Sequence, residues 1–579
     1  MASDDNLSAS ATVTAEATPL LSPETASVSS HTARDVFPFG SKVPDEEPLS
    51  KMRIISIVLS MWVLIFLQAS NMSGISTIQG TIAAEFDAYE SAMWLTSSYL
   101  ITMSSVAPLV GRFAQQFSPG AMIFVASFFF SIGAIVTSQA RSFPVFILGR
   151  IFVGIGGGGI MTLSLILVIQ LTSKSRRGLM IGLTNAGFTI GLSTGAIAYG
   201  ALMPLIGWRA VFWVQSPLGI IGGLGVYFSI PPYALHASSK GQTTRQKLAA
   251  VDYLGSLTLT ITIVVFLYSL STPKVLVIPL LVSLFVLLPL FLRIESSRRL
   301  TPTPILPLSI LSDRGILLSC LSQLTFMAAR WTVLFYAPVF ALAVRGLSPA
   351  AAGAALIPTN LGFGSGGLII GWLHIRRAGS FYAASVISLV FFGLVIFALS
   401  FASTLATPAA VYILILFAHG LCTGAALNYT LAHLLHLSHP SEHFIVTGLL
   451  STFRGFAGSF GTAIGGGLFS RTLHVALVEG FTRLDGQFPD EARQKLITVL
   501  LGSPAEVYKL GLEDRAVAMA GYETALKVLY HASAAVCVLV LFLQGGTGWK
   551  GKDMTEEEER EVEGLIEEEI VEHDGRMEA

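Results

Sequence analysis

The chain has 579 residues, of which 53% are hydrophobic and only 12% are charged, and its formal net charge is −1. A soluble domain carries roughly 25% charged residues, so this composition excludes a water-soluble globular protein and indicates an integral membrane protein. The near-neutral charge gives no indication of a nucleic-acid partner. Its three cysteines all fall in apolar stretches, so no disulfide framework is predicted.

The first segment, residues 1–52, is rich in Ser, Thr, Ala and Pro and lacks apolar periodicity, so we expect a disordered cytosolic tail. Within it, Glu16 precedes Leu20 and Leu21 with the spacing of an acidic dileucine sorting signal. Signals of this kind are typical of proteins delivered to endosomes and vacuoles, which makes a sorting adaptor a candidate partner. A chance occurrence in a tail is the equal alternative.

Fourteen apolar stretches follow, each with about the 20 residues that a helix needs to cross a bilayer. The connections predicted to face the cytosol carry thirteen lysines and arginines. The short outside connections carry only Arg141, Arg209, Lys274 and Arg345. This positive-inside bias predicts that both termini are cytosolic.

The predicted organisation is therefore all-α and polytopic, with 14 transmembrane helices. Its parts are a six-helix bundle over 53–230, a linker with two extra spans over 231–314, a second six-helix bundle over 315–548 and an acidic cytosolic tail over 549–579. The second bundle includes a long outside loop, residues 471–523, which contains helical-looking segments.

The stretch "GRIFVGIGGGGIMT" contains a glycine spacing that also occurs in dinucleotide sites. Gly154, Gly156 and Gly159 spell G-x-G-x-x-G. A dinucleotide fingerprint needs a strand before the glycines and a helix after them, within a soluble βαβ unit. Here the glycines lie inside one apolar run, where small residues allow a neighbouring helix to approach closely. We interpret them as helix-packing residues.

Several motifs in order along the chain resemble the major facilitator superfamily, specifically its fungal fourteen-span drug:proton antiporters. Arg150 and the glycine run resemble the fourth-span motif, and "GLSTGAIAYG", with Gly195 and Gly200, resembles the fifth-span motif. "GRFAQQFSPG" stands where the loop between spans two and three belongs, and "TFRGFAGSFGTAIGGGLFSR" resembles the penultimate span of fungal members that include vacuolar amino acid transporters. The resemblance implies the major facilitator fold and secondary active transport out of the cytosol, coupled to protons.

The sequence departs from the family pattern at positions that bear on proton coupling. Gln115 replaces the usual aspartate of the loop motif, and Asn71 stands in the first span where many relatives have an aspartate. Val153 and Ala196 replace a glutamine and a proline of the two span motifs. These departures argue against coupling through the family's standard residues.

Ionisable and amide side chains within the apolar spans are the candidate substrate-binding or coupling residues, because such groups are rare in membranes and mark transport pathways. They are Gln68, Asn71, Arg150, Asn185, Arg330, Asn360, His419, Asn428 and Arg454. Each also has a purely structural alternative, as a packing brace or a helix-to-helix hydrogen bond. For Trp94, Tyr99, Trp331 and Tyr336, we favour positions in lipid-interface belts over cavity walls.

The predicted function is the movement of small organic solutes out of the cytosol, most simply the uptake of amino acids into the vacuole. The alternatives are a plasma-membrane pump for drugs or metabolites and, in another class, a nutrient sensor that does not transport. We expect a monomer without cofactor or enzymatic activity. The histidines at 433, 436, 439 and 443 lack the further ligands that would close a metal site.

Overall fold

The computed structural model describes residues 51–171, 177–230, 252–272, 274–297, 308–373, 381–439 and 443–548. This described part of the chain is helical and contains no strand, which confirms the all-α class. Its first half consists of α2 (Lys51–Glu85), η2 (Tyr89–Ser91), α3 (Trp94–Gln116), α4 (Pro119–Ser138), α5 (Phe143–Leu171) and α6 (Arg177–Ser229).

Two groups of helices make up the rest. The central group consists of α8 (Tyr253–Ser271), α9 (Val277–Val282), the π-helical turn η4 (Ser283–Leu287) and α10 (Leu288–Glu295). The last group consists of α11 (Leu308–Leu311), α12 (Arg314–Ala343), α13 (Pro349–Ala354), α14 (Leu356–Leu373), α15 (Tyr382–Ala402), α16 (Ala409–Leu437), α17 (His443–Asp485), α18 (Glu491–Gly502), η6 (Pro504–Lys509) and α19 (Leu512–Gly545).

The helix α6 is two antiparallel helices joined at Gly207, which has φ +76° and is the non-helical residue inside it. Glycine adopts this backbone conformation without the steric strain of a Cβ. The fold-back is visible in the packing against α2, because Gly191 lies against Phe66 while Gly222, far along the chain, lies against nearby Leu64. A straight helix could not place both glycines beside the same turn of α2.

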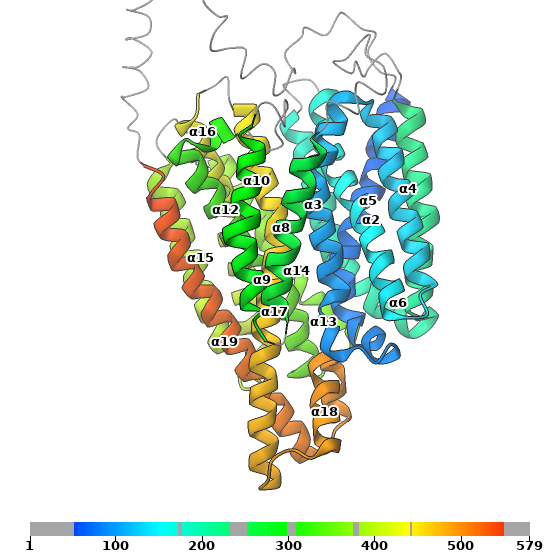
Figure 1. The fold of residues 1–579 in the computed structure, drawn as a ribbon, viewed down its shortest axis with the longest axis vertical. Helices are drawn as coiled ribbons and strands as arrows, with labels where there is room; N and C mark the ends of the chain where they lie inside the picture. The colour runs from blue at the N-terminus through cyan, green and yellow to red at the C-terminus, as the bar shows by residue number, and fades with distance from the viewer. Residues whose placement is uncertain are drawn as a thin grey trace, which may run out of the picture. The chain divides into compact units, whose positions relative to one another are not determined.

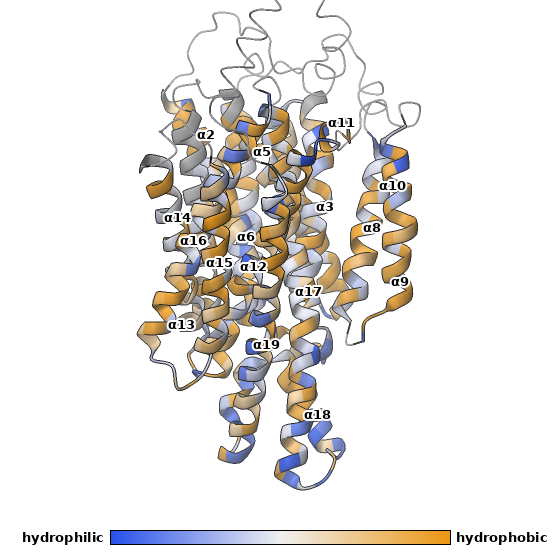
Figure 2. Cartoon of the chain, turned by 90° about the vertical axis from the view of Figure 1, so that its left-hand side faces the viewer, coloured by the Kyte–Doolittle hydropathy of each residue, from blue (hydrophilic) through white to orange (hydrophobic). Residues whose placement is uncertain are grey.

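Eleven helices of the described chain are long and apolar enough to cross a membrane. One of these is α6, which contains two membrane-length helices, and α3 and α17 are further long helices within the two bundles. The architecture therefore accommodates the 14 spans predicted from the sequence. The helices α2 to α6 pack as one bundle and α12 to α19 as a second, with α8 to α10 beside them (Figures 1 and 2).

The end at which α18 lies is called the loop end below, and the end at which α2 begins is called the tail end. At the loop end α17 and α19 extend past the other long helices, and α18 packs beside α17 and against η2 and α2 (Figure 1). The sequence predicts this segment as a loop after residue 470, whereas helix α17 continues to Asp485. The hydropathy of the chain falls after residue 470, but the residues there still favour a helix.

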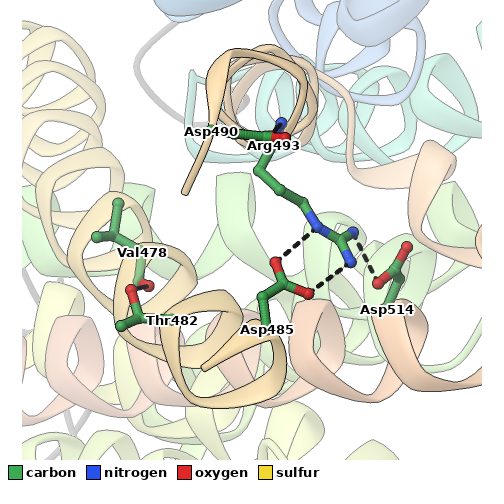
Figure 3. A network of polar contacts seen from close by, with 6 residues as sticks. All are labelled: Val478, Thr482, Asp485, Asp490, Arg493 and Asp514. Atoms are coloured by element: carbon green, nitrogen blue, oxygen red, sulfur yellow. Dashed lines mark hydrogen bonds and ion pairs between the residues drawn. The ribbon is translucent and has the colours of Figure 1, made fainter. Parts of the chain in front are cut away.

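An ion network fastens this extension (Figure 3). The guanidinium of Arg493 lies 2.9 Å from one oxygen of Asp485 and 2.8 Å from an oxygen of Asp514, so it joins the ends of α17 and α19 to α18. Hydrogen bonds to Asp514 and Asp485 raise the pKa of Arg493. The backbone N–H of Arg493 also donates to Asp490, which caps the start of α18.

The two bundles touch along their facing helices. Near the loop end, a Cβ on Gly200 of α6 would stand 2.5 Å from the backbone of Pro349, and one on Gly353 of α13 would stand 2.5 Å from that of Ala196. At mid-height the hydroxyls of Ser104 on α3 and Ser459 on α17 are 3.2 Å apart. The loop-end contacts are therefore backbone to backbone and leave no room for a solute.

Candidate functional site

A narrow cavity lies between the two bundles, in the half nearer the loop end. The cavity is small, about 10 Å³ and so little more than the room for one water molecule, in the conformation described. Its lining side chains are Met72, Ser73, Ser76, Thr96, Leu100, Leu192, Trp331, Leu334, Phe335, Leu356 and Thr462. Both bundles contribute, and the walls are mostly apolar with four hydroxyl groups, as is common for small-molecule sites.

Arg150 on α5 is the most completely enclosed charge of the first bundle, with none of its surface exposed. Its Nε donates to the carbonyl oxygen of Leu95 at 2.9 Å, and its Nη1 donates to the Oδ1 of Asn71. Its carbon Cζ lies 4.6 Å from the centre of the Tyr99 ring, a cation–π distance. Its remaining nitrogen, Nη2, has no hydrogen-bond partner in the part of the chain that the structure describes.

The hydrogen bonds continue from Asn71 into the outer helices of the bundle. The Nδ2 of Asn71 donates to Gln215 at 2.6 Å, and Gln215 donates to the hydroxyl of Tyr199 at 2.7 Å. This series of hydrogen bonds, which starts from one buried cation, joins α2, α5 and both halves of α6. In the described part of the chain, Arg150 thus contacts neutral oxygens and a ring face, and no carboxylate pairs with it.

Gln68, a second candidate on α2, is also buried and faces sulfur atoms. Its Nε2 lies 3.0 Å from the sulfur of Met72 and 3.2 Å from that of Met103. Its backbone carbonyl accepts from Tyr99 at 3.3 Å. Since thioethers are weak acceptors, this amide is held loosely, next to a residue of the cavity lining.

The glycine run of α5 lies within one continuous helix. A Cβ on Gly154 would stand 2.7 Å from the carbonyl oxygen of Tyr99 in α3, and one on Gly156 would stand 2.4 Å from the backbone nitrogen of Phe130 in α4. A Cβ on Gly159 would stand 2.6 Å from a side-chain atom in α4. The run therefore allows α3 and α4 to contact the backbone of the helix that carries Arg150.

In the fifth-span motif, both glycines also mark close approaches. A Cβ on Gly195 would stand 2.4 Å from the backbone of Ser70 in α2. Gly200 contacts the second bundle, as described above. One face of the same half of α6 thus packs inside the first bundle, while another meets α13.

Arg330 on α12 is the corresponding buried cation of the second bundle, with 4% of its surface exposed. Its Nη2 donates to the Oδ1 of Asn360 at 3.2 Å, and its Cζ lies 4.0 Å from the centre of the Phe363 ring. The Nδ2 of Asn360 donates in turn to the hydroxyl of Ser193 at 2.9 Å. Ser193 belongs to α6, so this hydrogen bond crosses from one bundle to the other.

The other candidates lie farther from the cavity lining. His419 is fully buried, with Nδ1 2.9 Å from the hydroxyl of Thr359, and Asn428 donates to the carbonyl of Gly424 within its own helix at 2.9 Å. Arg454 lies on α17, two turns towards the tail end from Thr462 of the cavity lining. The structure thus brings Arg150 together with Asn71, and Arg330 together with Asn360, but leaves Asn428 in a local contact.

Some predicted residues lie outside the described part of the chain. Glu16, Leu20 and Leu21 belong to a segment that is not described, and of Asn185 only its place in α6 is given. In the described residues no group of three His, Cys, Asp or Glu side chains could hold a metal ion, and the absence of a metal site stays a prediction.

Sequence reasoning missed four features of the site. Gln215 and Ser193, which complete the two hydrogen-bond chains, gave no signal because an isolated polar residue is common in such helices. Trp331 and Tyr99 were both expected in interface belts. Instead, Trp331 lines the cavity and Tyr99 contacts Arg150. Only the tertiary packing separates these roles.

A third group of charged residues lies at the tail end, where α8 begins and α10 ends. Asp252 and Glu295 are 6% and 3% exposed, and both lie beside Gly255. Arg112 of α3, 6% exposed, interacts electrostatically with both. This cluster attaches α8 and α10 to α3 of the first bundle and lies away from the cavity.

These residues can offer a ligand three kinds of interaction: hydrogen bonds from amides and hydroxyls, electrostatic attraction from the arginines, and apolar contact with the cavity walls.

A family model described as the Major Facilitator Superfamily matches residues 61–462. The chain is similar to multidrug resistance protein fnx1 of Schizosaccharomyces pombe, with 28% identity over 497 residues that cover 83% of this chain and 91% of that protein. It is also similar to vacuolar basic amino acid transporter 2 of Saccharomyces cerevisiae, with 27% identity over 464 residues, or 78% and 96% of the two chains.

Among solved structures, the fold is similar to a bacterial homologue of the human lysosomal transporter Spinster in an inward-facing and occupied conformation. The TM-score is 0.58 at 14% identity, and the match covers 86% of this chain and 97% of that one. At this identity the likeness concerns the fold.

Proposed function

Since this chain belongs to the Major Facilitator Superfamily of membrane transporters, we propose that it moves small organic solutes out of the cytosol by alternating access. The observation that carries this proposal is the cavity, because its walls come from both bundles. A site at the interface of two bundles opens to one side or the other when the bundles rock. The chain acts as a monomer in this proposal.

The packing supports a tail-end opening in the conformation described here. Backbone contacts close the loop end, and α18 adds to them, since a Cβ on Gly502 would stand 2.6 Å from the Cα of Tyr89 in η2. We place the tail end in the cytosol, with both termini, as the distribution of lysine and arginine indicates. Protease added to vesicles that expose the cytosolic face should then cut the segment at 172–176 and spare residues 486–511.

The solute that we propose is an amino acid, taken up into the vacuole. Two features support this proposal: the similarity to vacuolar basic amino acid transporter 2, and fixed cations that suit the α-carboxylate of an amino acid. The same cations repel a solute with a net positive charge, so we propose a neutral amino acid and not the basic amino acids of that relative's name. Plasma-membrane efflux of drugs or metabolites is the second candidate, and the apolar walls of the cavity favour it, because lipophilic solutes bind such walls.

Proton coupling is part of the proposal, and it uses groups other than the family's usual carboxylates. His419 is buried in the second bundle, and Glu85 at the loop end lies 2.6 Å from Arg209 and accepts from Trp208. Asp87, next to Glu85, is the third candidate. Uptake measured against an imposed pH gradient in His419→Gln, Glu85→Gln and Asp87→Asn would identify the coupling group, and an unaltered pH response in all three would reject this set.

The experiment that tests the function is localisation of the tagged protein, followed by uptake of labelled amino acids into vesicles from that membrane. Transport predicts accumulation above that of vesicles lacking the protein, whereas a nutrient sensor would bind without accumulation. Replacing Leu20 and Leu21 together with alanine should move a vacuolar protein to the cell surface. An unchanged distribution would remove the support that this motif gives to the vacuole.

A further inference from the structure

Arg330 is held by fewer groups than a buried guanidinium can bind. Two contacts are described, the hydrogen bond to Asn360 and the face of Phe363. Its Nη1 has no hydrogen-bond partner among the described residues, although Arg330 is only 4% exposed. A guanidinium carries five N–H donors, and leaving a buried one unbonded is unfavourable.

A second arginine lies nearby without compensation. Arg454 is one helical turn before Gly458 on α17, and a Cβ on Gly458 would stand 3.4 Å from the ring of Trp331, the neighbour of Arg330. Arg454 and Arg330 interact electrostatically, and both are positive. In the described part of the chain neither arginine forms an ion pair or meets a carboxylate, and Arg454 makes no hydrogen bond.

Arg330 is buried and Arg454 is half-buried, so water only partly screens the repulsion between their two positive charges. A single anion placed between them would remove that repulsion and fill the open donor of Arg330. Guanidinium groups bind carboxylates and phosphates well, because their donors match two acceptor oxygens.

We propose that Arg330 and Arg454 form a subsite for the carboxylate group of the transported solute, on the tail-end side of the cavity. The inference rests on the proposed function and deepens it, since it assigns the solute class as carboxylates without net positive charge. An amino acid in its zwitterionic form belongs to that class, and a solute with a net positive charge does not.

The subsite also links occupancy to contact between the bundles. Asn360 accepts a hydrogen bond from Arg330 and donates one to Ser193 in the other bundle. A carboxylate on Arg330 competes with the Oδ1 of Asn360. Release of Asn360 would loosen its bond to Ser193 and favour movement of one bundle against the other.

The test uses the purified full chain in detergent and measures its unfolding temperature with matched probes. Leucine is compared with leucinamide, and benzoate with benzamide, because each pair differs mainly in the carboxylate. We expect the two carboxylates to raise the unfolding temperature and the two amides to leave it near the value of the free protein. Equal effects within both pairs, or no effect of either carboxylate, would overturn the proposal.

Variants then assign the effect to the two arginines. Arg330→Gln and Arg454→Gln should each weaken carboxylate binding by roughly ten- to hundredfold, and without ligand should unfold at the same or a higher temperature, since repulsion is removed. Arg454→Lys keeps the charge and should bind with intermediate affinity. Arg471→Gln, on the same helix but bonded to α8, should respond like the unaltered protein. A full response in both glutamine variants would contradict the subsite.

Chloride and phosphate serve as further probes, because an inorganic anion offers similar chemistry. If either raises the unfolding temperature as much as leucine, the subsite is for inorganic anions and the solute assignment is wrong. Uptake separates this inference from the function. A protein that is stabilised by carboxylates but accumulates none in vesicles would contradict the proposed function alone, whereas equal uptake of leucine and leucinamide would contradict the subsite alone.

Discussion

Arg150 shows how the chain keeps a charge within the membrane. An arginine near the bilayer centre costs about 2.5–3.5 kcal/mol on insertion scales. Here a carbonyl of α3, the amide of Asn71 and the face of Tyr99 surround the guanidinium. Among the described residues one donor nitrogen of Arg150 has no partner, and Asn71 also donates to Gln215. This arrangement can change its hydrogen bonds when the bundle moves.

Replacing Arg150 therefore separates a role in transport from a role in folding. In Arg150→Ala the insertion cost disappears, but the oxygens of Leu95 and Asn71 lose their donor. We expect normal membrane insertion and a fall in transport of at least about tenfold, since a hydrogen bond to a charged group contributes about 1.5–3 kcal/mol. Arg150→Lys should keep part of the activity, because an ammonium lacks the planar fork of donors.

Protein abundance, localisation and uptake of labelled amino acids measure these outcomes in the same cells. Arg483→Ala is the control, because Arg483 is an exposed arginine whose ion pair lies on the surface of α17. Normal uptake through Arg150→Ala would contradict a transport role. Failure of that variant to insert would show that Arg150 is a structural brace.

For single residues, the sequence identifies the buried charged side chains well but predicts their hydrogen-bond partners poorly. Arg150 and Arg330 were identifiable because a charge inside an apolar run is conspicuous. Their bond partners Asn71 and Asn360 were candidates for the same reason. Ser193 was not, since a serine is unremarkable in a membrane helix, and its bond to Asn360 depends on two helices that are far apart in the chain.

Among the elements, α5 depends on glycine at the positions where other helices cross it. A Cβ on Gly156 would meet backbone atoms of α4 at 2.4 Å. Backbone atoms cannot turn aside as a flexible side chain can. The glycine run thus places α3 and α4 against the helix that carries Arg150.

We predict that Gly156→Ala lowers the free energy of unfolding by about 1–3 kcal/mol, because the added methyl group forces α4 away from α5. Gly455→Ala on α17 is the matched control, since nothing lies within 4 Å of its Cβ position. This control should be neutral or stabilising by about 0.4–1 kcal/mol. Thermal unfolding in detergent measures both, and a tolerated Gly156→Ala would contradict the described packing of α4 on α5.

The element α8 is attached to both bundles. At the tail end it lies with Arg112 of α3, and at the loop end Arg471 of α17 donates to the carbonyl oxygens of Leu270 and Thr272 at 2.9 and 3.0 Å. These are carbonyls at the end of a helix, which have no partner inside the helix. The central helices thus bridge the parts that alternating access requires to move.

Arg471→Ala should release the loop end of α8. We expect faster hydrogen exchange of the backbone amides over residues 264–271, with the tail end of α8 unchanged, because Asp252 still caps it. The control Arg483→Ala, whose side chain is 82% exposed, should leave exchange in α8 as it was. Unchanged exchange in Arg471→Ala would mean that packing alone holds this helix.

The elements themselves were largely predictable, because hydropathy reports where a helix can cross a membrane. Two features were not. The corner of α6 is a single glycine, Gly207, and the helices α17 and α19 continue beyond the apolar stretches into the segment predicted as a loop. Their outer turns are stabilised by Arg493 and the aspartates around it, a contact between segments that hydropathy does not register.

For the whole molecule, transport by alternating access depends on relative movement of the two bundles. The closed loop end has a defined contact, since a Cβ on Gly80 of α2 would stand 3.1 Å from the Cβ of Ser503, which follows α18. That distance is slightly below the usual 3.5–4.5 Å of a disulfide, so two cysteines could bridge there after a small shift. Cys320, Cys422 and Cys537 would first be replaced by serine or alanine, to leave one reactive pair.

The most direct test is uptake of labelled amino acids into vesicles by the Gly80→Cys, Ser503→Cys protein, before oxidation, after oxidation and after reduction. The account predicts that uptake stops when the bridge forms, because the loop end can no longer open, and that it returns when the bridge is reduced. Each single-cysteine protein should be unaffected by the same treatment. Undiminished uptake through a fully bridged protein would contradict alternating access by movement of the two bundles.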